Sequence, residues 1–188
     1  KSQDHGHWLA PGKFLFIPNG PHPSGPALLE EAAQGGPPRR LPWPPPTRTK
    51  GRVLDLGIQA VGGEIFYMRQ IIQDLPKGPD DSPQKPKRTA RYEWHRFDLA
   101  SWRWESEPNG TLDWPKPCAW HLISPDRVLG IAVHAESFRI DQRSYPFVVF
   151  KRQSSGEFKL EAPQEAGLDQ AAFRADGSWT YPWMGQLW

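Results

Sequence analysis

Apolar and polar side chains alternate with a period of two in the part of the chain that follows residue 50. Residues 52–58 and 64–68 both show this alternation, and Gly62-Gly63 lies between them. Strands place successive side chains on opposite faces, and a glycine pair accepts the positive φ angles of a tight hairpin turn. The pattern therefore predicts two strands joined by a glycine turn.

The same alternation continues over most of the remaining sequence. In residues 91–98, Tyr92 and Trp94 share one face, and a bend at Ala100-Ser101 leads into 102–107, which predicts a second hairpin. Further short strands are expected at residues 118–123, 128–133, 137–140, 147–151 and 157–160, between turns at 108–110 and 124–126. No long run with helical period follows residue 50, so residues 51–188 are predicted to form an all-β, mainly antiparallel domain.

Residues 1–50 are interpreted as a proline-rich N-terminal arm, because prolines and glycines interrupt most of the segment. Within it, residues 26–34 have the composition of a two-turn helix with proline at its start and glycine after its end. Residues 37–46 have the composition of a polyproline II helix. They suit either a ligand for an aromatic groove or a stiff linker laid across the domain with Trp43 packed on it, and the linker is favoured.

Residues 73–90 interrupt the strand pattern with prolines, glycine and alternating charges. Loops of more than about 12 to 15 residues inside a compact domain are usually functional or mobile. A disordered insertion is therefore expected at 73–90.

Two features of the β-rich part resemble a kelch blade. Gly62-Gly63 follows an apolar strand, and six residues separate Phe97 from Trp104. In that family a double glycine ends a blade strand, and a similarly spaced aromatic and tryptophan fill the space between neighbouring blades. The proline-rich, aromatic style from about residue 50 also resembles the divergent kelch-like proteins of grasses, in plants.

The resemblance implies incomplete kelch-like propeller blades, with a β-sandwich as the other architecture consistent with the pattern. The stretch from residue 126 looks like a second, degenerate blade, and the stretch from 179 looks like the start of a third. Closed propellers use four to eight blades, so the ring would remain open. Open sheet edges need a cover, which would be a partner or the chain's own arm.

Charge and composition bear on the partners and the compartment. The formal net charge is only +2 and does not favour nucleic acid. No stretch approaches the roughly 18 continuous apolar residues of a membrane span, so no membrane partner is expected. The only cysteine is Cys118, which fits a reducing compartment. This leaves the compartment undetermined, with an intracellular site, cytoplasm or nucleus, favoured.

The sequence contains none of the familiar nucleophile, phosphate-loop or dinucleotide motifs. Asp4, His5 and His7 are metal-ligand types, but a structural zinc site needs four ligands and none is spaced nearby. Glu105 and Glu107 share one strand face, whereas a glycosidase places its two carboxylates on opposite sides of the scissile bond. We therefore expect no enzyme, no catalytic residue, no metal and no cofactor.

Tryptophan and arginine are concentrated between residues 91 and 120. These side chains dominate protein-interface hot spots and stack on sugars when exposed, whereas alternation along a strand favours interior packing. The candidate binding residues are Trp94, Trp102, Trp104, Trp114, Trp120, Arg91 and Arg103. The leading hypothesis is a non-enzymatic protein–protein interaction module that binds another protein, or itself, through open sheet edges and exposed aromatics. The alternative is a carbohydrate-binding β domain that uses tryptophan faces to bind glycans.

Overall fold

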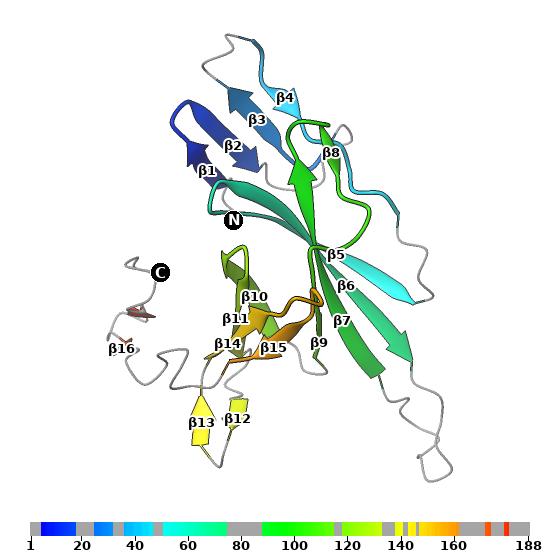
Figure 1. Cartoon of the computed structure of the whole chain (residues 1–188), viewed down its shortest axis with the longest axis vertical. Helices are drawn as coiled ribbons and strands as arrows, with labels where there is room; N and C mark the ends of the chain where they lie inside the picture. Colours follow the sequence, from blue (N-terminus) through cyan, green and yellow to red (C-terminus); the bar gives the residue numbers. More distant parts are fainter. Residues whose placement is uncertain are drawn as a thin grey trace. The chain divides into compact units, whose positions relative to one another are not determined.

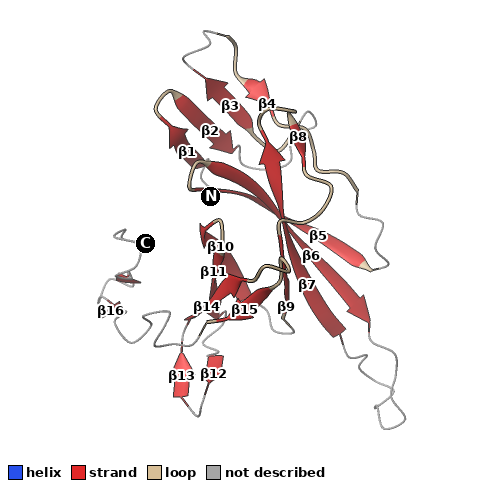
Figure 2. Ribbon diagram, in the orientation of Figure 1, coloured by secondary structure: helices blue, strands red, loops and turns tan. Residues whose placement is uncertain are grey.

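The computed structural model consists of short antiparallel strands and confirms the all-β class (Figures 1 and 2). The residues that it describes are 5–17, 25–31, 36–46, 51–74, 88–114, 118–132, 138–140, 143–145, 147–161, 172–173 and 179–180. Over these ranges there is no helix and no closed barrel or propeller. Nor is there, within them, a helix of the length and hydropathy that crosses a membrane.

The chain divides into two compact units, Lys1–Lys116 and Pro117–Trp188. The expected boundary at residue 50 is therefore corrected to one between Lys116 and Pro117. The reason is that residues from the proline-rich part and from the first β-rich hairpins belong to one hydrophobic cluster, and segments that share a core form one unit.

The N-terminal part forms a four-stranded sheet rather than only an extended arm. Its strands, in the order β1-β2-β3-β4, are β1 (His5–Ala10), β2 (Lys13–Ile17), β3 (Leu28–Glu31) and β4 (Arg39–Arg40). Strand β3 replaces the helix expected over residues 26–34. In register with β2 it sets Leu29 opposite Leu15, and both side chains are fully buried. A two-turn helix is marginal in isolation, so burial of this apolar pair decides the outcome.

The second sheet of the first unit contains the two predicted hairpins. Its strands are β5 (Arg52–Val61), β6 (Glu64–Asp74), β7 (Arg88–Asp98), β8 (Arg103–Trp104) and β9 (Gly110–Asp113), in the order β5-β6-β7-β8 with β9 also on β7. Gly62 and Gly63 have φ angles of 59° and 78° and connect β5 to β6. Positive φ at both central residues is the geometry of a two-residue hairpin turn, so this prediction is confirmed.

The ends of the predicted insertion belong to strands. Gln73 pairs with Thr89, and Asp74 pairs with Arg88, so β6 and β7 extend into the range 73–90. The boundary of the insertion is corrected accordingly, because continued ladder pairing satisfies these backbone groups. Its remaining residues, 75–87, lie outside the described part of the chain.

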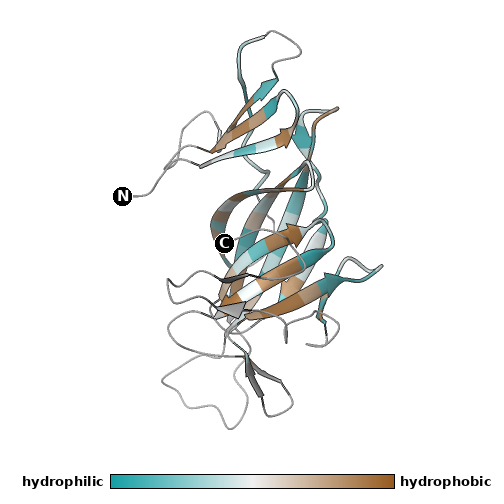
Figure 3. Ribbon diagram, turned by 90° about the vertical axis from the view of Figure 1, so that its left-hand side faces the viewer, coloured by the Kyte–Doolittle hydropathy of each residue, from teal (hydrophilic) through white to brown (hydrophobic). Residues whose placement is uncertain are grey.

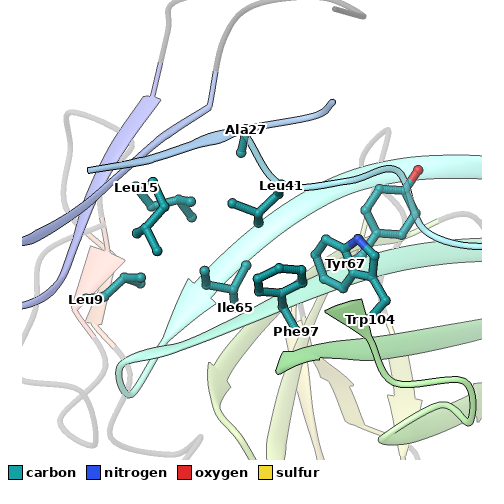
Figure 4. Close-up of a cluster of buried hydrophobic side chains, with 9 residues drawn as sticks. Leu9, Leu15, Ala27, Leu41, Ile65, Tyr67, Phe97 and Trp104 are labelled. Atoms are coloured by element: carbon teal, nitrogen blue, oxygen red, sulfur yellow. The ribbon is translucent and has the colours of Figure 1, made fainter. Parts of the chain in front are cut away.

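The core of the first unit lies between its two sheets. Leu15, Leu29 and Leu41 come from the N-terminal part, while Tyr67 and Trp104 come from the second sheet (Figure 4). All five side chains are at most 5% exposed. The two sheets of this unit therefore share one core, and each supplies apolar cover for the other.

The second unit is built on a four-stranded sheet in the order β10-β11-β14-β15. The strands of this sheet are β10 (Cys118–Ser124), β11 (Arg127–Ala132), β14 (Phe147–Arg152) and β15 (Phe158–Leu160). Two small two-stranded sheets complete the described part of the unit: β12 (Phe138–Ile140) with β13 (Arg143–Tyr145), and β16 (Ala172–Phe173) with β17 (Trp179–Thr180). Bands of hydrophobic and hydrophilic residues follow one another along several of the strands of the molecule (Figure 3). Residues 147–150 are buried without interruption, as expected for a central strand with both faces covered.

Candidate functional site

Three of the five candidate tryptophans belong to the interior. The exposed fraction is 1% for Trp94, 5% for Trp104 and 2% for Trp120. Trp102 and Trp114 are half-buried, and Trp120 belongs to the other compact unit from the remaining four. The candidate tryptophans therefore do not form one exposed platform. The three buried rings pack in the interior instead.

The two candidate arginines are exposed. Arg91 donates a hydrogen bond from Nε to a carboxylate oxygen of Glu93 at 3.2 Å. Arg103 lies opposite Asp98 in the register of the β7–β8 pair. The Glu93 carboxylate accepts a hydrogen bond from His95 Nε2 at 3.4 Å, and this bond, with a smaller effect of Arg91, keeps the pKa of Glu93 below its ordinary value. Of the two arginines, Arg91 thus forms an ion pair with Glu93, and a pair with one exposed side chain contributes little to stability.

The residues of the blade motif lie at the junction of the two sheets of the first unit. Phe97 is opposite Trp104 in the β7–β8 pair, and their ring centroids are 4.9 Å apart in an edge-to-face arrangement. Trp104 also approaches Tyr67, with centroids 5.6 Å apart. The aromatic pair therefore fills the space beneath the β1–β4 sheet (Figure 4). Membership of the kelch family stays a prediction.

Residues 41–46, which we call the docked segment, lie against the second sheet of the first unit and belong to no strand. Leu41 and Pro44 are buried, whereas the four residues Pro42, Trp43, Pro45 and Pro46 are exposed. Burial thus repeats every third residue, which is the period of a polyproline II helix. Trp43 is 43% exposed, so more than half of its surface is covered, and the expectation that it packs on the domain stays a prediction.

Side-chain N–H groups of the second sheet bind alternate carbonyl oxygens of this region. Trp102 Nε1 donates to the carbonyl of Arg40 at 3.3 Å, and Trp104 Nε1 donates to that of Pro42 at 2.7 Å. Arg69 donates from Nη2 to the carbonyl of Pro44 at 3.3 Å. A buried indole N–H requires an acceptor, and a proline carbonyl outside a ladder is a suitable one.

The surroundings of these donors are aromatic and polar. Arg69 is 5% exposed and is held by Asp55, with 3.2 Å between Nε and the carboxylate oxygen. Burial, together with the Asp55 carboxylate, raises the pKa of the Tyr67 hydroxyl well above its ordinary value. The Arg39 guanidinium lies 3.4 Å from the centroid of the Trp102 ring, a cation–π contact.

A separate aromatic group lies on the outer face of the β1–β4 sheet. Trp8 is 73% exposed and packs edge-on against Phe14, with ring centroids 5.0 Å apart. Trp8, Gly12, Phe14 and Glu30 line a hollow of about 210 Å³. These residues are not among the candidates predicted from the sequence. The alternation along the two strands could have identified them, because it places Leu9 and Leu15 inward and therefore turns Trp8 and Phe14 outward.

A second, wider hollow of about 480 Å³ lies beside the β7–β8 turn, where Asp98, Arg103 and Glu105 line it. Two of its carboxylates, those of Asp98 and Glu105, have partners. Asp98 accepts hydrogen bonds from the backbone of Ala100 and Ser101, and Glu105 accepts one from Arg96 Nε at 2.8 Å. These bonds stabilise the β7–β8 hairpin and commit the carboxylates of Asp98 and Glu105 to its structure.

Comparisons of the chain with protein-family models, with curated proteins and with solved structures gave no match.

Proposed function

We propose that the chain is a non-enzymatic protein–protein interaction module, and that the Trp8–Phe14 face of the β1–β2 hairpin binds another protein. The observation that carries the proposal is the 73% exposure of Trp8 beside a hollow of about 210 Å³. Tryptophan is enriched among the residues that dominate binding free energy at interfaces. An apolar ring left in water is costly unless a partner covers it.

The position of Trp8 on a terminal strand supports the same function. In the described part of its sheet, β1 has β2 as neighbour on one side and no strand on the other. An edge strand offers backbone N–H and C=O groups to an extended segment of a partner. The aromatic side chains would then supply the apolar contact, while the strand edge supplies the register.

Carbohydrate binding is a second candidate, and the surroundings of Trp8 favour it too. Phe14 is opposite Glu30 in the β2–β3 pair, so that a carboxylate lies on the same outer face as the two aromatic rings. A sugar ring stacks on an aromatic face, and its hydroxyl groups donate to a neighbouring carboxylate. The two candidates therefore compete for the same surface.

Trp8→Ala tests the proposal, and Trp43→Ala is its matched control, because both replace a tryptophan that is at least 43% exposed. The immobilised full-length variants are compared for the proteins that they retain from the cells that make the chain, and their self-association is followed by light scattering. A protein, or a second copy, that binds the wild type and Trp43→Ala but is lost from Trp8→Ala supports an interaction module.

Soluble oligosaccharides separate the two candidates. Saturable quenching of tryptophan fluorescence by a glycan, absent from Trp8→Ala alone, would favour carbohydrate binding. A wild-type chain that stays monomeric and retains the same proteins as Trp8→Ala would overturn the protein-binding proposal.

A further inference from the structure

The docked segment is held in a manner that does not depend on most of its side chains. Three donors, Trp102, Trp104 and Arg69, bind the carbonyl oxygens of residues 40, 42 and 44. Only Leu41 and Pro44 of the segment are buried. A polyproline II helix has no internal hydrogen bonds, so that its carbonyl groups are available to external donors. The contacts thus recognise a backbone conformation and two side chains spaced three residues apart.

The donors are held in place by contacts of their own, Trp104 and Arg69 from strands and Trp102 from the β7–β8 turn. Trp104 is in β8 and packs against Phe97, and Trp102 also lies edge-on to Phe97, with centroids 5.2 Å apart. Arg69 is in β6 and is oriented by Asp55. Donors placed this way before a ligand binds lose little side-chain entropy when they engage it.

The geometry points to a docking groove for proline-rich segments in the polyproline II conformation, formed by Trp102, Trp104 and Arg69, which we call the indole groove. The chain's own residues 41–46 fill this groove, and a segment of another protein with the same Leu-x-x-Pro spacing can replace them. Proline-rich ligands bind aromatic grooves because they are already extended before binding. This site is distinct from the Trp8–Phe14 face of the proposed function.

Residues 41–46 occupy the groove, so an external ligand can bind only in molecules from which this segment has moved away. A tethered segment acts at an effective concentration in the millimolar range for short linkers. An external ligand must therefore compete with residues 41–46, and its apparent affinity falls with the fraction of molecules whose groove is open. Arg39 stacks on the Trp102 ring, so a basic residue two positions before the leucine belongs to the preferred ligand.

Two neighbouring prolines provide a matched pair of variants. Pro44 is buried in the groove, whereas Pro45 is exposed. Pro44→Ala weakens the intramolecular contact, and Pro45→Ala makes the same chemical change outside it. The probe is a dye-labelled synthetic peptide of residues 36–46, added to the full chain and followed by fluorescence anisotropy and by the indole N–H NMR signals of Trp102 and Trp104.

We expect the wild type and Pro45→Ala to bind the peptide weakly, and Pro44→Ala to bind it roughly tenfold more tightly. Both indole signals should shift in proportion to occupancy. A peptide with alanine at the positions of Leu41 and Pro44 should not bind. Trp8→Ala should bind the peptide as the wild type does, so that a failure of the proposed function leaves this result unaffected.

Arg39→Ala provides a second route, because Arg39 is exposed and its guanidinium lies on the ring of Trp102. If Pro44→Ala does not fold, tighter peptide binding by Arg39→Ala supports the inference. It is overturned if the folded variants fail to bind the peptide at about 1 mM, or bind it no more tightly than the wild type.

Discussion

Gly25 permits the docked segment to approach the β1–β4 sheet, and replacing it with alanine should release the segment. Its φ angle is +140°, and a Cβ atom at this position would fall on the carbonyl oxygen of Leu41. A residue with a side chain pays about 1 to 3 kcal/mol for such a backbone conformation. Moving Leu41, which is fully buried, adds about 1.5 to 3 kcal/mol of lost burial. Gly25→Ala should therefore destabilise the first unit by about 2.5 to 6 kcal/mol.

Gly36→Ala is the control, since a Cβ atom there meets nothing within 4 Å. Its effect should stay within about 0.5 kcal/mol. The assay is a urea titration of the full chain, followed by the indole N–H signals of Trp102 and Trp104, which report the first unit alone. A midpoint for Gly25→Ala that coincides with that of Gly36→Ala would refute the reasoning, because Leu41 would then be free to move without cost.

Three further predictions concern stability. The pKa of Glu93 lies below its ordinary value of 4.5, chiefly because of His95. The ionised carboxylate therefore stabilises the fold above pH 4.5, and this stabilisation is lost as the pH falls through the lower pKa of the folded state. Glu93→Gln should accordingly weaken the dependence of the urea midpoint on pH at acid pH. Glu161 is 8% exposed and accepts two hydrogen bonds from Arg127, so Glu161→Ala should cost the second unit about 3 kcal/mol in urea unfolding. Deleting residues 1–50 removes one side of the core of the first unit, so the product should bind a hydrophobic dye, and the indole N–H signals of Trp102 and Trp104 should lose their dispersion.

The elements that could be predicted from the sequence are those specified locally. The hairpin at Gly62-Gly63 combines alternation on both sides with the two residues that its φ angles require. The strand that ends at Ser124 is likewise followed by a turn of the predicted composition. In each case neighbouring residues carry the whole signal, so no knowledge of distant contacts was needed.

The N-terminal sheet was missed because its stability comes from distant partners. Strand β3 has four residues, and β4 has two. Neither shows a usable periodicity, and the surrounding prolines are typical of extended linkers. Leu29 becomes a core residue only when β3 pairs with β2 and packs over Ile65 and Tyr67. A pattern that depends on such pairing is invisible in a window of a few residues.

The candidate tryptophans show why residue type alone does not separate core from binding surface. The ring of Trp104 is in the core, while its N–H group binds the carbonyl of Pro42, so one side chain serves packing and recognition together. Both sides of this contact are present in the same chain, which contains a tryptophan-rich hairpin and a proline-rich segment. Polyproline carbonyls need external donors, and buried indoles need acceptors. Each therefore satisfies the other, as the hydrogen bond from Trp104 Nε1 to the carbonyl of Pro42 shows.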